Sequence, residues 1–301
     1  MNEKLYYYTD INTFKLILKN GTLRFKESTS SNDNLDTVQL HEHLVKMARD
    51  KIHEKEITPE EKFYYDMINH IGSKHNRITL VACFTSKKDS RMLWDAYTMH
   101  RKDREAERYN GVCIEFDRSK LVQSMNANGL FFDDKSCQEI VYGFEKIDPQ
   151  LEKLVEEFSA EVDKLSKDDD QTQNIIKPIP VPLTRKEVVL KKCIVIPVLH
   201  LSDKFDRTAP FYKHAFWGEE SEIRAVLSMK TGSKYAMELS EYDDGSRYYD
   251  LKISPDSINK VILGPEFLPE DVMEVSKVDG NIAFDMLQTE MSSGTGVITN
   301  R

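Results

Sequence analysis

Alternation of apolar and polar residues along the chain predicts β-strands. In the segment EIRAVL (222–227), every second residue from Ile223 onward is apolar, which is the period of a half-buried strand. Glu222 and Arg224 therefore share one face of that strand. The run ITLVACF (78–84) is almost entirely apolar and predicts a strand buried on both faces. Further strands are expected near these segments: 6–8, 22–26, 111–117, 138–142, 234–241, 247–253 and 258–263.

Helical periodicity and capping residues predict helices between these strands. Thr9 or Asp10 can cap a helix that ends at Gly21. Capping boxes open two further helices at 58–61 and 184–187. Additional helices are expected around these segments: 38–47, 92–97, 150–168 and 269–275. Because strands and helices do not alternate as βαβ units, we expect the α+β class, with a mostly antiparallel mixed sheet surrounded by helices.

A change in composition near residue 144 predicts an insertion. Residues 1–143 and 211–288 are expected to form one main domain, and residues 144–210 a helical and loop-rich insertion. Within it, the acidic run and the proline-fixed KPIPVPL stretch of 168–184 predict a surface linker. The small, polar segment 289–301 is expected to be a flexible tail.

Composition limits the kinds of partner. The 301 residues carry a formal net charge of −9, which argues against diffuse electrostatic binding to nucleic acid or acidic membranes and leaves room only for a local basic groove. The chain has neither a long apolar run nor an apolar N-terminal signal. We therefore expect a cytoplasmic protein without a membrane partner. The oligomeric state does not follow from the sequence.

Cysteines and histidines give no metal-binding pattern. The cysteines are scattered without a CxxC pair, so we expect reduced core thiols, with Cys83 and Cys113 as buried packing residues. His41 and His43 fall on different faces of a helix. No metal is expected. Neither GxGxxG, GxxxxGK, HExxH nor GxSxG occurs, which argues against a Rossmann site, a P-loop, a zincin and an α/β-hydrolase.

Glu222 and Arg224 follow an aromatic stretch that includes Phe216 and Trp217. An acid and a fixed guanidinium beside aromatic walls would suit a planar or sugar-containing ligand. A Glu–Arg pair on one strand face is also a common surface ladder worth a few tenths of a kcal/mol, and both interpretations stay open.

Several segments in a particular order resemble a known bacterial family. They are LYYYTD (5–10), NGTLRF (20–25), SND (31–33), ACFTSKKDSRMLWDAYT (82–98), GVCIEFD (111–117), IVY (140–142), FWGEESEIR (216–224) and INKVILGP (258–265). Together they resemble domain-of-unknown-function family 2971, whose name carries no established reaction. The resemblance covers nearly the whole chain and is weakest over 144–210.

The N-terminal pattern also resembles the opening of the ADP-ribosyltransferase fold: a Tyr-x-Tyr-Thr strand and then a helix ending in N-G-x-L. That resemblance implies NAD as the substrate, a protein or nucleic-acid acceptor, and Glu222 as the catalytic residue. Tyr7 takes the place of the expected ribose-binding His, which tyrosine matches only as an uncharged hydrogen-bonding group. By analogy it also implies an effector of phage defence or a toxin system.

These observations select a set of candidate site residues. Glu222 is the candidate catalytic residue, and Tyr7, Trp94 and Glu222 are expected to converge on one pocket. The candidates for substrate binding are Tyr7, Thr9, Asn32, Trp94, Tyr97, Trp217 and Arg224. Each has a structural alternative, as a core aromatic residue, a helix cap or a turn residue. The alternative functions are a non-catalytic nucleotide- or partner-binding module and a nuclease.

Overall fold

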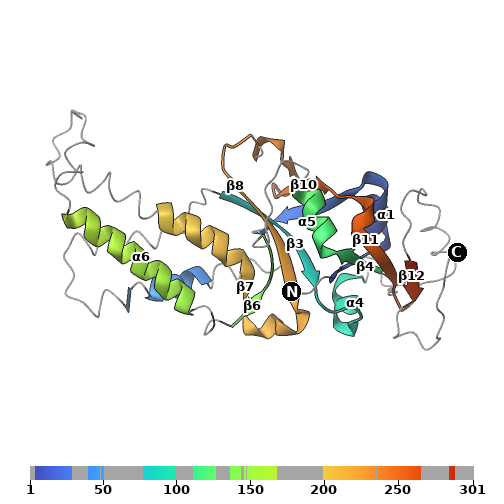
Figure 1. Ribbon diagram of the computed structural model, residues 1–301, viewed down its shortest axis with the longest axis horizontal. Coiled ribbons are helices and arrows are strands. Elements are labelled where there is room, and N and C mark those ends of the chain that lie inside the picture. Colours follow the sequence, from blue (N-terminus) through green and yellow to red (C-terminus); the bar gives the residue numbers. More distant parts are fainter. Residues whose placement is uncertain are drawn as a thin grey trace.

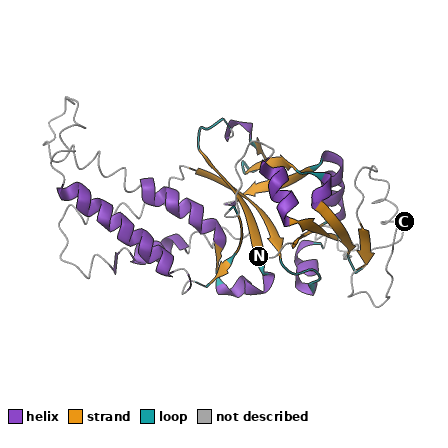
Figure 2. Ribbon diagram, in the orientation of Figure 1, coloured by secondary structure: helices purple, strands orange, loops and turns teal. Residues whose placement is uncertain are grey.

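A ten-stranded sheet forms the centre of the molecule, and helices extend from one end of it (Figures 1 and 2). The computed structural model describes residues 4–28, 40–47, 49–50, 77–98, 111–126, 136–143, 146, 148–167, 199–234, 236–265 and 285–288. The sheet is mostly antiparallel and is accompanied by helices. The fold is α+β, as the sequence predicts.

The strands of the large sheet come from both ends of the chain. The order is β12-β11-β4-β1-β3-β2-β10-β9, while β8 pairs with both β3 and β5. Their bounds are β1 Lys4–Thr9, β2 Thr22–Glu27, β3 Arg77–Thr85, β4 Val112–Asp117, β5 Cys137–Glu139, β8 Glu222–Lys230, β9 Ser240–Glu241, β10 Arg247–Lys252, β11 Ile258–Leu263 and β12 Asp285–Gln288. β11 and β12 run parallel. A second, two-stranded parallel sheet joins β6 (Val141–Tyr142) to β7 (Tyr212–Lys213).

β3 is the strand at which this sheet branches. Along one edge it pairs with β8 over its whole length, from Arg77↔Lys230 to Thr85↔Glu222. Its other edge is shared, because β2 pairs with the middle of β3 and β1 meets only its end, at Tyr6↔Thr85. β1 and β2 therefore diverge beside the end of β3 that carries Thr85.

One face of the sheet carries the main core. Helices α1 (Ile11–Asn20) and α5 (Arg118–Asn126) pack there (Figure 1). Of the two caps considered for α1, Asp10 is the one used, since its carboxylate accepts two backbone N–H groups of the first turn. Gly21 ends the helix with φ 59°, a left-handed conformation that glycine adopts without strain.

The opposite face is covered in part by helix α4 (Arg91–Tyr97). Tyr6 and Tyr8 of β1 pack there against Trp94, which is fully buried. The ring of Tyr8 meets the indole edge-on at 4.8 Å. Ser90 occupies the N-cap position of α4 without a side-chain capping bond. Cys83, near the end of β3, is exposed on this face, and the candidate site lies there.

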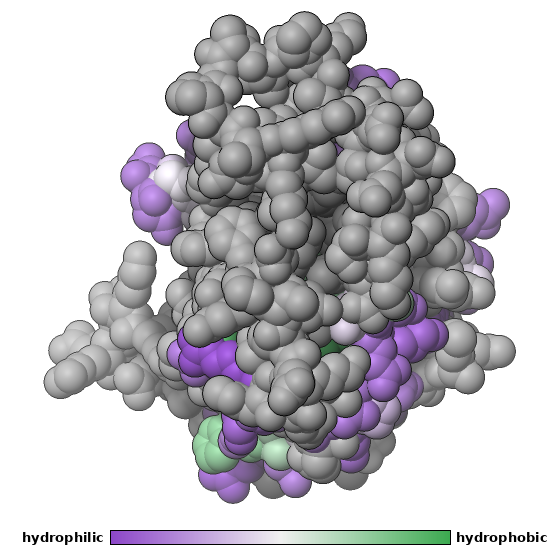
Figure 3. Space-filling model, turned by 90° about the vertical axis from the view of Figure 1, so that its left-hand side faces the viewer, coloured by the Kyte–Doolittle hydropathy of each residue, from purple (hydrophilic) through white to green (hydrophobic). Residues whose placement is uncertain are grey.

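A separate helical cluster extends from the sheet. It combines α6 (Asp148–Lys167), the helical residues 40–47 and the helix at 199–208, which Figure 1 shows grouped at one end of the molecule. Its buried side chains are Leu40, Leu44, Leu151, Val155, Phe158, Leu201, Phe205, Ala209 and Tyr212. Viewed from this end, the described surface is mainly hydrophilic (Figure 3).

Two strand predictions need correction. The strand expected over 138–142 is divided at Ile140 between β5 and β6, because the chain leaves the large sheet there to pair with β7. The strand expected near 234–241 is only the two-residue β9. Several predicted segments lie outside the described residues: the helices that begin at 58–61 and 184–187, the helix at 269–275, the linker at 168–184 and the tail at 289–301.

Candidate functional site

Glu222 and Arg224 form a buried ion pair at the start of β8. Their strand alternates as predicted, so both side chains lie on the sheet face that carries Tyr6 and Tyr8. Arg224 Nε donates to Glu222 Oε1 at 2.7 Å, and Arg224 Nη2 donates to Oε2 at 3.2 Å. Arg224 Nη1 donates to the carbonyl of Pro210 at 2.9 Å. The pair is therefore a fixed internal group and differs from an exposed surface ladder.

Lys213 joins this pair to a second carboxylate. Its Nζ lies 2.7 Å from Glu220 Oε2 and 3.3 Å from Glu222 Oε2. The Lys213 side chain is only 1% exposed and that of Glu222 only 7%. Two carboxylates and two cations thus share one buried network, whose formal charges balance.

Backbone geometry places the two glutamates. Glu220 ends the 3-10 helix η5 (Ala215–Glu220), and Ser221 then adopts a left-handed φ of 47°. Among the described residues, Ser221 alone combines a positive φ with a side chain. Such a conformation is costly for a residue other than glycine and often occurs at functional sites. The Thr85 hydroxyl donates to the Glu220 carbonyl at 2.7 Å, and the Glu222 N–H donates to the Tyr142 hydroxyl at 2.7 Å.

A small cleft opens onto this network. It encloses about 40 Å³. The residues that line it are Tyr6, Tyr8, Cys83, Phe84, Thr85, Leu93, Tyr97, Glu220 and Glu222. Such a volume holds a hydroxyl-sized group or a water molecule, since pockets that enclose drug-sized ligands measure roughly 300–1,000 Å³. A larger ligand would have to lie mainly at the mouth of the cleft.

Glu222 carries a negative charge in this setting. Burial alone would raise its pKa, but Arg224 and then Lys213 oppose that effect and hold the pKa of Glu222 below its ordinary value. The Tyr97 hydroxyl donates to Glu220 Oε1 at 3.4 Å, and burial and the charge of Glu220 raise the pKa of Tyr97. The cleft therefore presents a carboxylate beside neutral tyrosines at physiological pH.

Cys83 corrects one sequence prediction. It was expected to be buried on both sides of its strand, yet it is exposed at the cleft, whereas Cys113 and Cys137 are buried. Cys83 lies opposite Arg224, on the sheet face that also carries Glu222 and Tyr6, where it lines the cleft. The surrounding protein removes much of its water, and this desolvation, with the charge of Glu222, raises the pKa of the thiol. Cys83 is therefore a neutral thiol in the lining of the cleft.

Exposed aromatic residues lie beside the network. Tyr97 is 48% exposed and Trp217 is 38% exposed. The Lys213 Nζ lies 4.9 Å from the centroid of the Trp217 ring, and the rings of Phe216 and Trp217 meet edge-on at 5.2 Å. Phe216 is exposed as well. Tyr97 thus offers apolar surface at the cleft itself, and Phe216 and Trp217 offer it beside Lys213.

The expected convergence of Tyr7, Trp94 and Glu222 does not occur. Tyr7 and Thr9 alternate with Tyr6 and Tyr8, so their side chains lie on the opposite face of β1 from Glu222. The Tyr7 ring packs 5.8 Å from that of Phe84, against the main core.

The other candidates divide between the core and the site. Trp94 is a core residue, and its indole N–H donates to Asp89 at 2.7 Å. The structure brings Tyr97, Trp217, Glu222 and Arg224 together. Asn32 lies outside the described residues.

Lys213 and Glu220 were not among the predicted site residues. A buried lysine is rare, and no pattern in the local sequence predicts that the partners of Lys213 are Glu220 and Glu222. One signal was present, because Lys213 interrupts an aromatic stretch that includes Tyr212 and Phe216.

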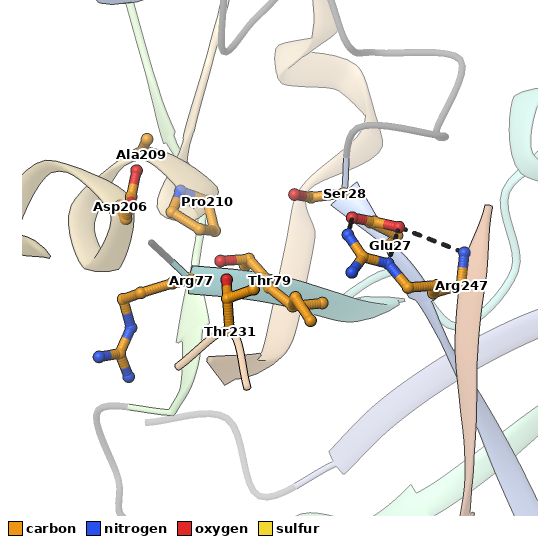
Figure 4. Close-up of a pocket in the computed structure, with 10 residues that line it drawn as sticks. Glu27, Ser28, Arg77, Thr79, Asp206, Ala209, Pro210, Thr231 and Arg247 are labelled. Atoms are coloured by element: carbon orange, nitrogen blue, oxygen red, sulfur yellow. Dashed lines mark hydrogen bonds and ion pairs between the residues drawn. The ribbon is translucent and has the colours of Figure 1, made fainter. Parts of the chain in front are cut away.

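A second cavity of about 190 Å³ lies between the sheet and the helical cluster (Figure 4). Three charged side chains of its lining, those of Glu27, Arg77 and Arg247, already have internal partners. Arg247 pairs with Glu27, as Figure 4 shows, and Arg77 donates to Ser228 and to Asp203. We therefore place the candidate site at the smaller cleft, which combines the buried charges with exposed aromatic rings.

The described ranges hold no group of three or more His, Cys, Asp or Glu side chains arranged to bind a metal ion. His43 Nε2 instead lies 2.5 Å from Asp148 Oδ1, within the helical cluster. No helix in the described part of the chain is both long enough and apolar enough to span a membrane.

Comparison with known proteins tests the family resemblance found in the sequence. Searches of curated proteins and of solved structures give no match. A family model does match, over residues 93–225, a span that includes most of α4, the parts of the helical cluster at 148–167 and 199–212, and the start of β8. This stretch, which holds Glu220, Glu222 and Arg224, is similar to the family described as Protein of unknown function (DUF2971), as the sequence resemblance indicated.

Proposed function

We propose that the chain is a cytoplasmic enzyme of the ADP-ribosyltransferase or NAD-cleaving type, with Glu222 as its catalytic carboxylate. The observation that carries the proposal is the ionised Glu222 side chain at a cleft lined with hydroxyl groups and flanked by exposed aromatic rings. The left-handed Ser221 between the two glutamates supports it, because backbone strain is commonly found at functional sites.

The chemistry needs a carboxylate that is charged before the reaction begins. The bond between ribose C1 and the pyridinium nitrogen of NAD breaks, and its electron pair leaves with neutral nicotinamide. Water or an acceptor nucleophile then bonds to C1 and releases a proton. The ribose passes through an oxocarbenium-like state, whose positive charge a fixed carboxylate stabilises. Glu222 meets this requirement because Arg224 and Lys213 keep it ionised and in place.

The dimensions of the cleft restrict how NAD could bind. A cavity of about 40 Å³ admits a ribose hydroxyl, while the planar rings would lie outside it. Tyr97 lines the cleft and is partly exposed, and Trp217 is exposed beside Lys213, so both rings offer surfaces for stacking. The acceptor, whether water, a protein or a nucleic acid, would approach from the same open side.

A second candidate function is a non-catalytic module that binds a nucleotide or a partner. The observation in its favour is that both carboxylate oxygens of Glu222 already accept hydrogen bonds from Arg224 or Lys213. A carboxylate engaged in this way is well suited to shape a cleft and has less capacity left for a substrate hydroxyl.

One experiment separates the two candidates. Purified protein is incubated with NAD, and nicotinamide release is followed by chromatography, while NAD binding is measured by calorimetry. The enzyme proposal predicts release that falls about a hundredfold or more in Glu222→Gln and stays unchanged in Glu219→Gln, whose side chain is 84% exposed. Binding without release would favour the module. If NAD is neither bound nor cleaved, the enzyme proposal is excluded, and so is a module that binds NAD.

The role in defence or toxicity is tested in cells. If the chain cleaves NAD, its expression should lower the cellular NAD level and slow growth, and Glu222→Gln should remove both effects. Slow growth that persists in this variant at an unchanged NAD level would have a different cause.

A further inference from the structure

Lys213 is the point at which the helical cluster meets the site. It lies on β7, which follows the helix at 199–208 and the short 3-10 helix η4 (Ala209–Phe211). Adjacent residues of a strand point to opposite sides. On β7 this places the Tyr212 side chain in the helical cluster and the Lys213 side chain against the two glutamates.

Tyr212 is firmly held on its own side of β7. Its ring is buried with the apolar residues of the helical cluster, and its hydroxyl donates to Gln150 of α6. β7 is also paired with β6, in the register Val141↔Tyr212 and Tyr142↔Lys213. The position of Lys213 is therefore fixed from the helical side of the molecule.

The two glutamates need this lysine. Glu220 and Glu222 both contact a single Lys213 ammonium, so their carboxylates lie close together in a buried place. Like charges at such a distance favour the uptake of a proton by one of them. An ammonium between them allows both to stay ionised.

We propose that Lys213 is a positioning residue, which holds Glu222 ready for its role, and that the helical cluster places Lys213 by anchoring Tyr212. The catalytic meaning of this inference rests on the proposed function. The effect of Lys213 on the two glutamates is independent of that function, because it concerns only the ionisation state of their carboxyl groups.

The groups around Glu222 come from several elements. Arg224 lies on β8 itself, and the others are Lys213 of β7, Glu220 of η5, Cys83 of β3, Tyr97 of α4 and Tyr142 of β6. Among these neighbours Arg224 and Lys213 supply positive charge. Loss of Lys213 would leave Arg224 to balance two carboxylates.

The experiment measures the carboxyl groups directly. Protein labelled with ¹³C at the glutamate side-chain carboxyl is titrated by NMR, with Glu222→Gln and Glu220→Gln used to assign the two signals. In Lys213→Met we expect one of the two carboxyl groups to titrate about 1–3 pH units higher than in the wild type. Lys213→Arg should restore most of the difference. The control is Lys204→Met, because Lys204 is an exposed lysine of the same helical cluster that pairs with Glu157.

Tyr212 tests the anchoring. Tyr212→Ala should raise the pH at which the same carboxyl group titrates. Tyr212→Phe, which keeps the ring, should change this midpoint less. Unchanged titration in Lys213→Met would overturn the positioning role, and unchanged titration in a folded Tyr212→Ala protein would overturn the anchoring.

Activity supplies a second, separate reading. If NAD is cleaved, the acid limb of the pH–rate profile should move upward in Lys213→Met by the same amount as the carboxyl titration. If NAD is not cleaved, the NMR result still decides the role of Lys213, so failure of the proposed function and failure of this inference can be told apart.

Discussion

Glu222→Gln removes the charge of Glu222 and almost nothing else. Arg224 and Lys213 would then face one remaining carboxylate, that of Glu220, in a place where the Lys213 and Glu222 side chains are 1% and 7% exposed. Breaking a buried ion pair from one side costs about 3–5 kcal/mol, because the partner charge stays buried without compensation. For a domain of this size each kcal/mol lowers the melting temperature by about 2–4 °C, so we expect a loss of about 6–20 °C at pH 7.

The loss of stability in Glu222→Gln should depend on pH, in a direction set by the pKa of Glu222. The pKa of Glu222 is lower in the folded protein than in the unfolded chain. Its ion pairs therefore stabilise the fold fully above the unfolded pKa of about 4.3, and this stabilisation is lost as the pH falls through the folded pKa. The difference in unfolding free energy between the wild type and Glu222→Gln should be large at pH 7 and should shrink steadily below pH about 4.

Urea unfolding and calorimetry at several pH values measure this difference. The matched control is Glu219→Gln, since Glu219 is 84% exposed and pairs with Lys87 at the surface. We expect it to change stability by no more than about 0.5 kcal/mol. The reasoning would be refuted if Glu222→Gln melted together with the wild type, or if Glu219→Gln were equally damaging.

Three further predictions concern the fold. Gly111→Ala should destabilise the protein strongly or prevent folding, because a Cβ atom there would lie 2.3 Å from Thr98 Cβ. In calorimetry the control Gly218→Ala should melt close to the wild type, since its Cβ atom would lie 4.0 Å from its nearest neighbour. Asp10→Ala should cost about 1 kcal/mol in urea unfolding, since it removes the side-chain cap of α1, and an unchanged midpoint would contradict that role. Limited proteolysis should cut first within 168–184, as its composition predicts, and mass spectrometry of early fragments that begin elsewhere would disprove the prediction.

Periodicity predicted the strands well and partly predicted the site. The alternation around Glu222 correctly placed it on one face with Arg224, because period-2 patterns report the face of a strand directly. The same rule separates Tyr7 from Tyr6 and Tyr8. It could not say which of these two faces would meet Glu222, since that depends on how β1 and β8 are placed around β3.

Long-range charge pairing could not be predicted. Lys213 lies on a two-residue strand that has no periodicity of its own, and its burial depends on β7 pairing with β6. Cys83 was misjudged for a related reason. An apolar run suggests burial on both faces, but the cover on each face comes from other elements, and here those elements leave Cys83 exposed.

The branching of the sheet at β3 has a consequence for how the protein is made. Thr85 leaves the ribosome about 140 residues before its partner Glu222. At 5–20 residues per second the apolar strand β3 waits about 7–28 s for β8. During that time its free edge is open to pairing with other chains. We therefore expect the nascent chain to depend on chaperones in this interval, and slower translation of the segment before β8 to lower the yield of soluble protein.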